Sequence, residues 1–490
     1  MIQVVLWLPL AAGLLCFFIP RTGVRAVPVL GGLAALVLAV IVVAGFDPDA
    51  SGLQHPVDES WIPTLGVGYQ LGVDGISVYL VLLTALLWAA ATAWSAIRLP
   101  DRSRLYFFML GLAETATLGA FLAQDLLLFV LFFDLMLVPF YFLIGAWGGE
   151  NRIAATTKMI VYTLVGSLLM LVGAIATAII ASDQVGELSF SLADLRANVL
   201  GEGSQDWIFW FFAAAFLVKM PAFLVHGWMP DAYRAAPLPV LAVLSGVVAK
   251  VGAYGFLRVV LPLYPDATLQ FQEVVLTIAV ASILYGSVMA FTQTNVRLVA
   301  GFSSVAQLGF ITLGIFSLRP DGADGAVLQM VNHGLVVAPI FLIAALLAER
   351  AGTGDLREMG GLALRAPVLA AMFLIVTLAL LAMPGSANFI GEFFILNGTF
   401  QAKIGFAFAA CIGIALAAFY AIRLFQQTVH NRLVSGVESR EISLPDAAVL
   451  APLVACIVAL ALYPGLILDA GEESVQQALS PETPLVAGTE

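Results

Sequence analysis

The feature that most constrains this chain is a succession of apolar segments, each about 20 residues long, separated by short polar connections. A helix of that length spans the hydrocarbon core of a bilayer. Hydrophobic residues make up 61% of the 490 residues and charged residues only 11%, which leaves no stretch for a soluble catalytic domain. The sequence therefore predicts an all-α polytopic membrane protein with about fourteen transmembrane helices, at 2–19, 26–46, 76–97, 105–123, 126–147, 159–181, 207–228, 240–261, 274–291, 298–316, 326–347, 368–400, 404–425 and 447–468.

Cysteine, histidine and net charge exclude several kinds of chemistry. The three cysteines lie far apart inside apolar segments, and the four histidines form no pair on one helix at a spacing suited to haem. We therefore expect no metal site and no redox cofactor in this chain. The net charge is −11 and no basic tract is present, so nucleic acid is not an expected partner.

Two predicted helices contain a Met-Pro break. Met220-Pro221 follows Lys219 in the seventh segment, and Met383-Pro384 lies in the middle of the twelfth. An odd separation of five helices places the two breaks in opposite orientations, which is typical of an inverted repeat. We expect two five-helix repeats, helices 4–8 and 9–13, and a division of the chain into 1–104, 105–261, 262–428 and 429–490. We also expect each proline to leave a carbonyl free for water, at Leu217 and Leu380.

The basic residues predict the orientation in the membrane. About fifteen of the 21 Lys and Arg residues fall in connections that follow odd-numbered helices, among them Arg98 and Arg350. By the positive-inside rule these connections face the cytoplasm, and both termini lie on the outer side. The outer connection at 61–71 is rich in glycine and β-forming residues, which predicts a short hairpin.

Ionisable residues inside the predicted helices are the candidate functional residues, because a charge at the centre of a bilayer costs about 2.5–3.5 kcal/mol on insertion scales. They are Asp134, Lys219, Lys250, His333, Glu392 and Glu114. Burial favours the neutral form of a lysine and a nearby carboxylate favours the ammonium form. Opening and closing of an Asp134–Lys219 pair would therefore make the lysine alternately a proton acceptor and a proton donor. Together, these six residues predict a path for protons through the membrane.

A purely structural role is the alternative for these residues. Charges that pair between helices hold a bundle together without titrating. Glu114 is equally well explained as such an interhelical anchor, and His333 as a neutral histidine bonded to a neighbouring hydroxyl. The alternation of acidic and basic groups through both halves of the chain favours the proton path over a structural scaffold.

Ordered motifs along nearly the whole chain resemble the antiporter-like membrane subunits of respiratory complex I. This resemblance implies a fourteen-helix fold with two inverted five-helix repeats, in agreement with the segments above. The motifs are Leu71-Gly-Val-Asp-Gly-Ile-Ser77, Asp125-Leu-Leu-Leu-Phe129, Phe216-Leu-Val-Lys-Met-Pro221, His226-Gly-Trp-Met-Pro-Asp231, Ala249-Lys-Val-Gly-Ala-Tyr-Gly255, Ser303-Ser-Val-Ala-Gln-Leu-Gly-Phe310 and Met383-Pro-Gly-Ser-Ala-Asn-Phe-Ile-Gly-Glu-Phe393.

The resemblance also implies an activity. Most related subunits carry a lysine at the second broken helix, whereas the M-type branch carries a glutamate, as this chain does at Glu392. A member of that branch is a proton-translocating, non-redox subunit of NADH–quinone oxidoreductase in the bacterial inner (plasma) membrane. FMN, iron–sulfur clusters and quinone are then expected in other subunits, and L- and N-type antiporter-like subunits as partners. The alternative is a subunit of a multisubunit sodium/proton antiporter.

By the same resemblance, Lys219 is the central pumping lysine, Lys250 the connecting lysine, His333 the link of the eleventh helix and Glu392 the terminal carrier. One position departs from the family pattern. The partner of the lysine on the fifth helix is normally a glutamate, and this chain has Asp134. Either the helices lie closer together, or water bridges the pair, or a second carboxylate such as Glu114 shares the work.

Overall fold

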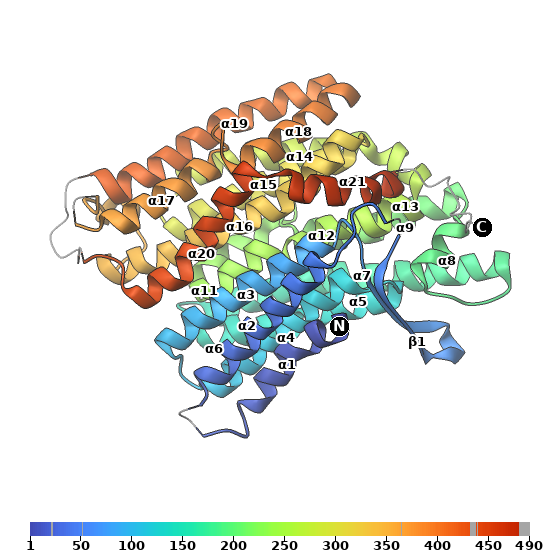
Figure 1. The fold of residues 1–490 in the computed structure, drawn as a ribbon. Helices are drawn as coiled ribbons and strands as arrows, with labels where there is room; N and C mark the ends of the chain where they lie inside the picture. Colours follow the sequence, from blue (N-terminus) through green and yellow to red (C-terminus); the bar gives the residue numbers. More distant parts are fainter. Residues whose placement is uncertain (21–22, 51, 364, 432–437, 439, 480–490) are drawn as a thin grey trace.

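The computed structural model describes residues 1–20, 23–50, 52–363, 365–431, 438 and 440–479 as one elongated bundle of helices (Figure 1). Within these residues, eleven helices are long and apolar enough to cross a membrane. The shorter apolar helix α1 (Ile2–Leu15) and two broken helices bring the number of passes to about fourteen, as predicted.

The N-terminal part consists of three helices and a hairpin. α1 packs against α4 (Ser103–Leu122), and α2 (Ala26–Ala44) packs against α3 (Val78–Arg98). Between α2 and α3, the antiparallel strands β1 (Gln54–Ile62) and β2 (Val67–Val73) form the predicted hairpin, closed by the 3-10 turn η1 (Pro63–Leu65). Gly66 ends this turn with φ of +65° and packs so closely on Leu188 that a side chain would collide with its carbonyl.

The first five-helix unit contains a kinked helix, a broken helix and two π-helical turns. The break follows Lys219, the last residue of α9. The elements after α4 are α5 (Leu126–Leu135), α6 (Leu137–Trp147), α7 (Arg152–Val185), α8 (Leu192–Ala197), α9 (Glu202–Lys219), η2 (His226–Trp228), α10 (Met229–Ala235), α11 (Leu238–Val243), η3 (Leu244–Val248), α12 (Lys250–Gly255), η4 (Phe256–Val260) and α13 (Leu261–Leu263).

The second unit repeats the same plan of long helices around a broken one. Its break separates α17 from α18, at the Met383-Pro384 position that the sequence predicts. The elements are α14 (Pro265–Thr292), α15 (Val296–Phe316), α16 (Pro320–Ala351), η5 (Leu356–Glu358), α17 (Pro367–Leu380), α18 (Ala387–Ala402), α19 (Ile404–Phe425) and η6 (Gln426–His430).

The C-terminal part differs from the sequence-based expectation. The predicted last helix at 447–468 is two helices, α20 (Leu444–Leu462) and α21 (Gly465–Leu479), separated at Pro464. α21 packs on α16, and the backbone N–H of Gly75 donates to Ser474 Oγ at 3.0 Å. Residues 480–490 of the expected tail lie outside the described residues.

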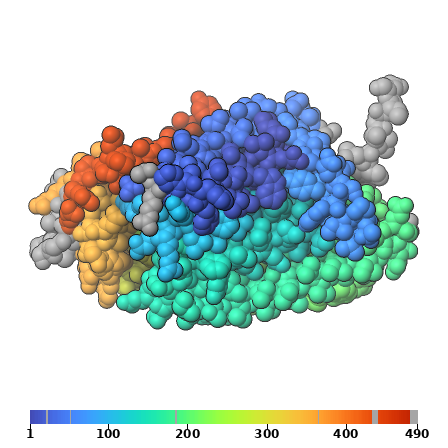
Figure 2. Space-filling model, turned by 90° about the horizontal axis from the view of Figure 1, so that it is seen from below, coloured from blue at the N-terminus to red at the C-terminus, as the bar shows by residue number. Residues whose placement is uncertain are grey.

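Position in the bundle decides which helices can hold a buried site. The apolar parts of the segment Leu238–Leu263, of α15 and of α16 are completely buried, whereas only about a third of the residues in the apolar parts of α2, α19 and α20 are buried. Figure 2 shows the N-terminal helices in blue lying over the first unit in cyan and green, with part of the second unit at one side. The buried helices are the ones that carry Lys250 and His333.

Candidate functional site

The six predicted residues lie in six different passes of the bundle. Five of them, Glu114, Lys219, Lys250, His333 and Glu392, are buried, and Asp134 is partly exposed. The described residues contain no group of three or more His, Cys, Asp or Glu side chains arranged to hold a metal ion.

Lys219 is held at the end of α9 by an unusual backbone pattern. Pro221 has no N–H to continue the helix, and the N–H of Ala222 reaches one residue further back, to Leu217 O at 2.9 Å. The expectation of a free carbonyl at Leu217 is therefore wrong, because this carbonyl accepts the N–H of Ala222 in a wider turn. The chain then folds back, and Trp228 Nε1 donates to Val218 O at 3.0 Å.

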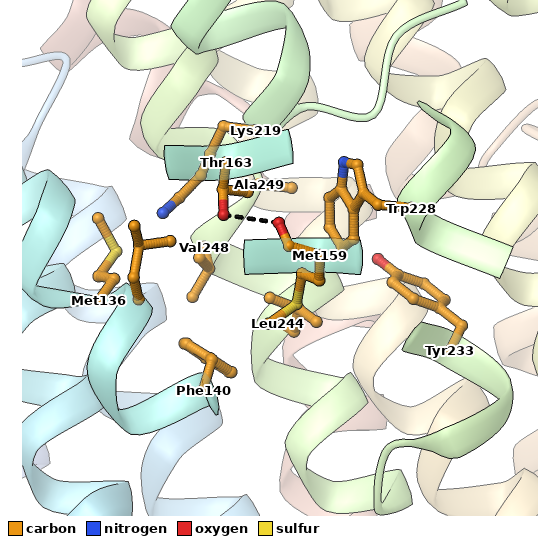
Figure 3. Close-up of a pocket in the computed structure, with 11 residues that line it drawn as sticks. Met136, Phe140, Met159, Thr163, Lys219, Trp228, Tyr233, Leu244, Val248 and Ala249 are labelled. Carbon is orange, nitrogen blue, oxygen red and sulfur yellow. Dashed lines mark hydrogen bonds between the residues drawn. The ribbon is translucent and has the colours of Figure 1, made fainter. Parts of the chain in front are cut away.

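The Lys219 side chain extends into a small cavity with a volume of about 20 Å³ (Figure 3). That volume accommodates about one water molecule. The lining is mainly apolar, with the side chains of Thr163, Trp228 and Tyr233 as its other polar groups, and includes Met136, Leu137, Phe140, Met159, Leu244, Val248 and Ala249. The ammonium nitrogen lies 4.5 Å from the centre of the Phe133 ring, a favourable cation–π distance.

Asp134 lies next to Phe133 in the chain but forms no ion pair with Lys219. None of the ion pairs found between described residues, within 4.0 Å, includes either side chain. Asp134 Oδ1 and Glu114 Oε1 are buried atoms without a hydrogen-bond partner among the described residues. The Ser167 hydroxyl donates to Leu164 O at 3.2 Å. Asp134 and Lys219 are thus not paired in this structure.

Lys250 occupies a position created by a π-helical turn. In η3 the N–H of Ala249 bonds to Leu244 O at 3.1 Å, so Ser245 O does not receive its usual helical donor. Lys250 Nζ donates to this carbonyl at 2.6 Å and lies 2.8 Å from His333 Nδ1. With a charged Lys250, Nδ1 of the neutral imidazole must be the acceptor, and Nε2 carries the ring hydrogen.

Glu392 is surrounded by uncharged amides. Gln307 Nε2 donates to Glu392 Oε1 at 2.7 Å, and Gln329 Nε2 donates to Gln307 Oε1 at 2.7 Å. Gln329 precedes His333 by four residues on α16, so the two side chains share one face of that helix. The amide chain of Glu392 and the Lys250–His333 pair therefore reach the same face of α16.

Tyr233 lines the Lys219 cavity. Ser245, whose carbonyl accepts from Lys250 Nζ, donates its hydroxyl to Ser304 Oγ at 3.0 Å. The buried Lys219, Lys250, His333 and Glu392, together with Tyr233, Ser245, Ser304, Gln307 and Gln329, are called the buried polar row below. Glu114 has no described contact with this row.

The neutral members of the row were not predicted from the sequence: Tyr233, Ser245, Ser304, Gln307 and Gln329. Only ionisable residues in the apolar segments were candidates. Amides and hydroxyls inside otherwise apolar segments carry the same signal, since a buried polar group must find a partner. Gln307 even lies inside a quoted motif, without an assigned role.

Comparisons with known proteins agree with this fold and site. A family model described as "NADH:quinone oxidoreductase/Mrp antiporter, TM" matches residues 123–417. The fold and the buried charged row therefore define an antiporter-like membrane subunit, and the chain belongs to this family.

Individual relatives are more specific. NADH-quinone oxidoreductase subunit M of Rhodobacter capsulatus is 36% identical, over 96% of this chain and 94% of its own length. A chain of respiratory complex I from Thermus thermophilus with bound NADH superposes with a TM-score of 0.89 at 30% identity, covering 98% of this chain and 100% of that one. A chain of the Mrp complex from Dietzia sp. DQ12-45-1b has a TM-score of 0.83 at 21% identity, covering 98% of each chain, which shows a shared fold alone.

Proposed function

We propose that this chain is the proton-translocating M-type membrane subunit of an NADH–quinone oxidoreductase and moves protons along its buried polar row. The observation that carries the proposal is the 2.8 Å contact between Lys250 of the first unit and His333 of the second. This contact joins two halves of the bundle that each contain a broken helix, so a proton can pass from one half to the other without leaving the protein.

Each residue of the row has a distinct role in the proposal. Lys219 takes up a proton when the Asp134 carboxylate approaches and releases it when the pair opens, because the carboxylate stabilises the ammonium. Water in the cavity beside Tyr233 carries the proton towards Lys250, and His333 passes it on towards Glu392. Glu392 is the terminal carrier. Glu114 is a second carboxylate that can share the role of Asp134; it is buried, and its Oε1 has no partner among the described residues.

The proposal includes the arrangement of the whole complex. The units 105–261 and 262–428 each form one transport unit, with 1–104 and 429–490 as supporting segments. L- and N-type antiporter-like subunits contact this chain in an inner (plasma) membrane, and FMN, iron–sulfur clusters and quinone are bound elsewhere. Both termini face the outer side, because the basic connections such as that at Arg98 face the cytoplasm.

Replacement of Lys219 tests the proposal. In the intact complex in membrane vesicles, Lys219→Ala should abolish nearly all proton translocation, and NADH–quinone turnover should fall in parallel because the two are coupled. Lys158→Ala is the matched control, since Lys158 is an exposed lysine paired with Asp231 at 2.9 Å. An unchanged ratio of protons moved per electron at full turnover in Lys219→Ala would overturn the proposal. Loss of assembly alone, with normal pumping by the remaining complex, would support the structural role instead.

The sodium/proton antiporter is disfavoured by the residue at position 392. Most related subunits have a lysine at this place, and this chain has Glu392. The two functions differ in their driving force. Vesicles containing the native complex should acidify only when NADH is oxidised; sodium-driven proton exchange without NADH would favour the antiporter.

A further inference from the structure

Glu392 is held by a chain of two amides whose direction is fixed. The only hydrogen-bond donor to its carboxylate among the described residues is Gln307, which donates to Oε1, while Oε2 is buried and has no partner. Glu392, Gln307 and Gln329 are at most 3% exposed, so bulk water does not compete for these bonds.

The direction of the chain follows from the chemistry of carboxamides. An isolated glutamine side chain can turn its amide over and present oxygen instead of NH₂. Turning Gln307 over alone would place its amide oxygen against the carboxylate and would lose the bond in which its Oε1 accepts from Gln329 Nε2 at 2.7 Å. Gln329 thus keeps the NH₂ group of Gln307 facing the carboxylate.

Gly391, the residue before Glu392, leaves the space that the Gln329 side chain occupies. A Cβ atom at Gly391 would overlap Gln329 Oε1, and would lie 3.1 Å from Gln329 Cβ. Glycine at this position allows Gln329 to lie against α18. Alanine would displace Gln329 without changing Glu392 itself.

We propose that Gln307 and Gln329 are positioning residues that direct proton transfer to a single oxygen of Glu392. Oε1 accepts from Gln307 in both protonation states, since it is a carboxylate oxygen in one and the carbonyl oxygen of the acid in the other. The proton therefore adds to and leaves from Oε2. This inference rests on the proposed function, because it assumes that Glu392 carries the proton.

Oε2 is the oxygen of Glu392 that remains free for the proton. It is buried and has no partner among the described residues, and the same holds for Gln329 Oε1 and His333 Nε2 on α16. Buried polar atoms in proteins are almost always satisfied, so these atoms are the ones at which further hydrogen bonds can form.

Methionine substitutions test the positioning role, since methionine resembles glutamine in length but has no N–H. We expect Gln307→Met and Gln329→Met to lower NADH-driven proton translocation about tenfold, because the first removes the donor to Glu392 Oε1 and the second removes the group that orients this donor. The pH profile of turnover should shift by about one unit, which a purely structural defect would not cause. Gln307→His, which retains an N–H donor, should keep most of the activity.

The control is Gln205→Met, at another buried glutamine, which bonds to Leu200 O and Asp266 outside the row. Turnover is normalised to the amount of assembled complex. Gly391→Ala is a second variant that displaces Gln329, and it should have the same effect as Gln329→Met. Wild-type pumping and pH profile in both Gln307→Met and Gln329→Met would overturn this inference. If Lys219→Ala still abolishes pumping in that case, the proposed function stands; if Lys219→Ala pumps normally, the proposed function itself fails.

Discussion

At the scale of single residues, the separation of Asp134 from Lys219 is the most informative detail. The lysine lies over the Phe133 ring instead of in an ion pair. Aspartate is one methylene shorter than the glutamate found in related subunits. The shorter side chain makes a direct ion pair with Lys219 harder to form, and the proposed mechanism requires this pair to open and close.

Asp134 can be lengthened or neutralised to test this point. Asp134→Glu should maintain or increase NADH-driven proton translocation, because the longer side chain closes the pair more easily. Asp134→Asn should lower it about tenfold, the effect of roughly 1.4 kcal/mol in the protonation equilibrium of the lysine. Initial rates of proton uptake in vesicles measure both. Equal rates in Asp134→Asn and wild type would show that this carboxylate takes no part.

At the scale of elements, breaks and π-helical turns place the row. Pro221 ends α9 directly after Lys219, and the turn η3 gives Lys250 a backbone carbonyl acceptor. In both cases a hydrogen bond reaches five residues back instead of four. The second break shows the same pattern, with Met383 N–H bonded to Leu378 O at 3.1 Å. Such irregular backbone is tolerated at membrane depth only where protein surrounds it.

Removal of the first break provides a test at this scale. Pro221→Ala restores an N–H that competes for Leu217 O and favours continuation of α9. A longer α9 would break the hydrogen bond from Trp228 Nε1 to Val218 O and change the shape of the cavity beside Lys219. We expect proton translocation to fall several-fold while the complex still assembles. Pro452→Ala, inside the peripheral helix α20, is the matched control and should leave pumping unchanged.

At the scale of the whole molecule, two charged clusters connect the two ends of α3 with later parts of the chain. Asp74, just before α3, bonds to Arg258 Nη1 at 2.7 Å, and Gln124 also accepts from Arg258. At the other end of α3, Arg98 bonds to Asp446 at 2.8 Å and to Glu349 at 2.6 Å. The clusters lie about 30 Å apart along a helix of 21 residues, the thickness of the hydrocarbon core.

The buried cluster should matter most for stability. Asp74→Asn leaves the Arg258 charge buried without its partner, and we expect a loss of about 3–5 kcal/mol. Thermal inactivation of the purified complex should show a clear decrease in its midpoint, and Asp74→Asn combined with Arg258→Gln should recover part of it. Glu273→Gln, which breaks an exposed pair with Lys403, should change the midpoint little. An equal decrease in both single variants would contradict this assignment.

The sequence by itself determined the class of protein, the positions of both breaks and the charged residues of the row, but not the buried Asp74–Arg258 pair. It could do so because an apolar segment, a helix-breaking proline and an intramembrane charge each have a large local cost that depends little on what surrounds them. The extra helix α21 was not predicted, since its mixed polar sequence gains stability only by packing on α16.

Only the tertiary structure decided which polar groups meet. The contact of Lys250 with His333 joins residues 83 positions apart, and the bond of Gln307 to Glu392 joins residues 85 positions apart. Backbone irregularities such as η3, and amides that become partners only across helices, depend on how the helices pack and leave no periodic signal along the chain. The sequence therefore provided the charges of the row, and packing of the helices arranged the neutral groups that connect them.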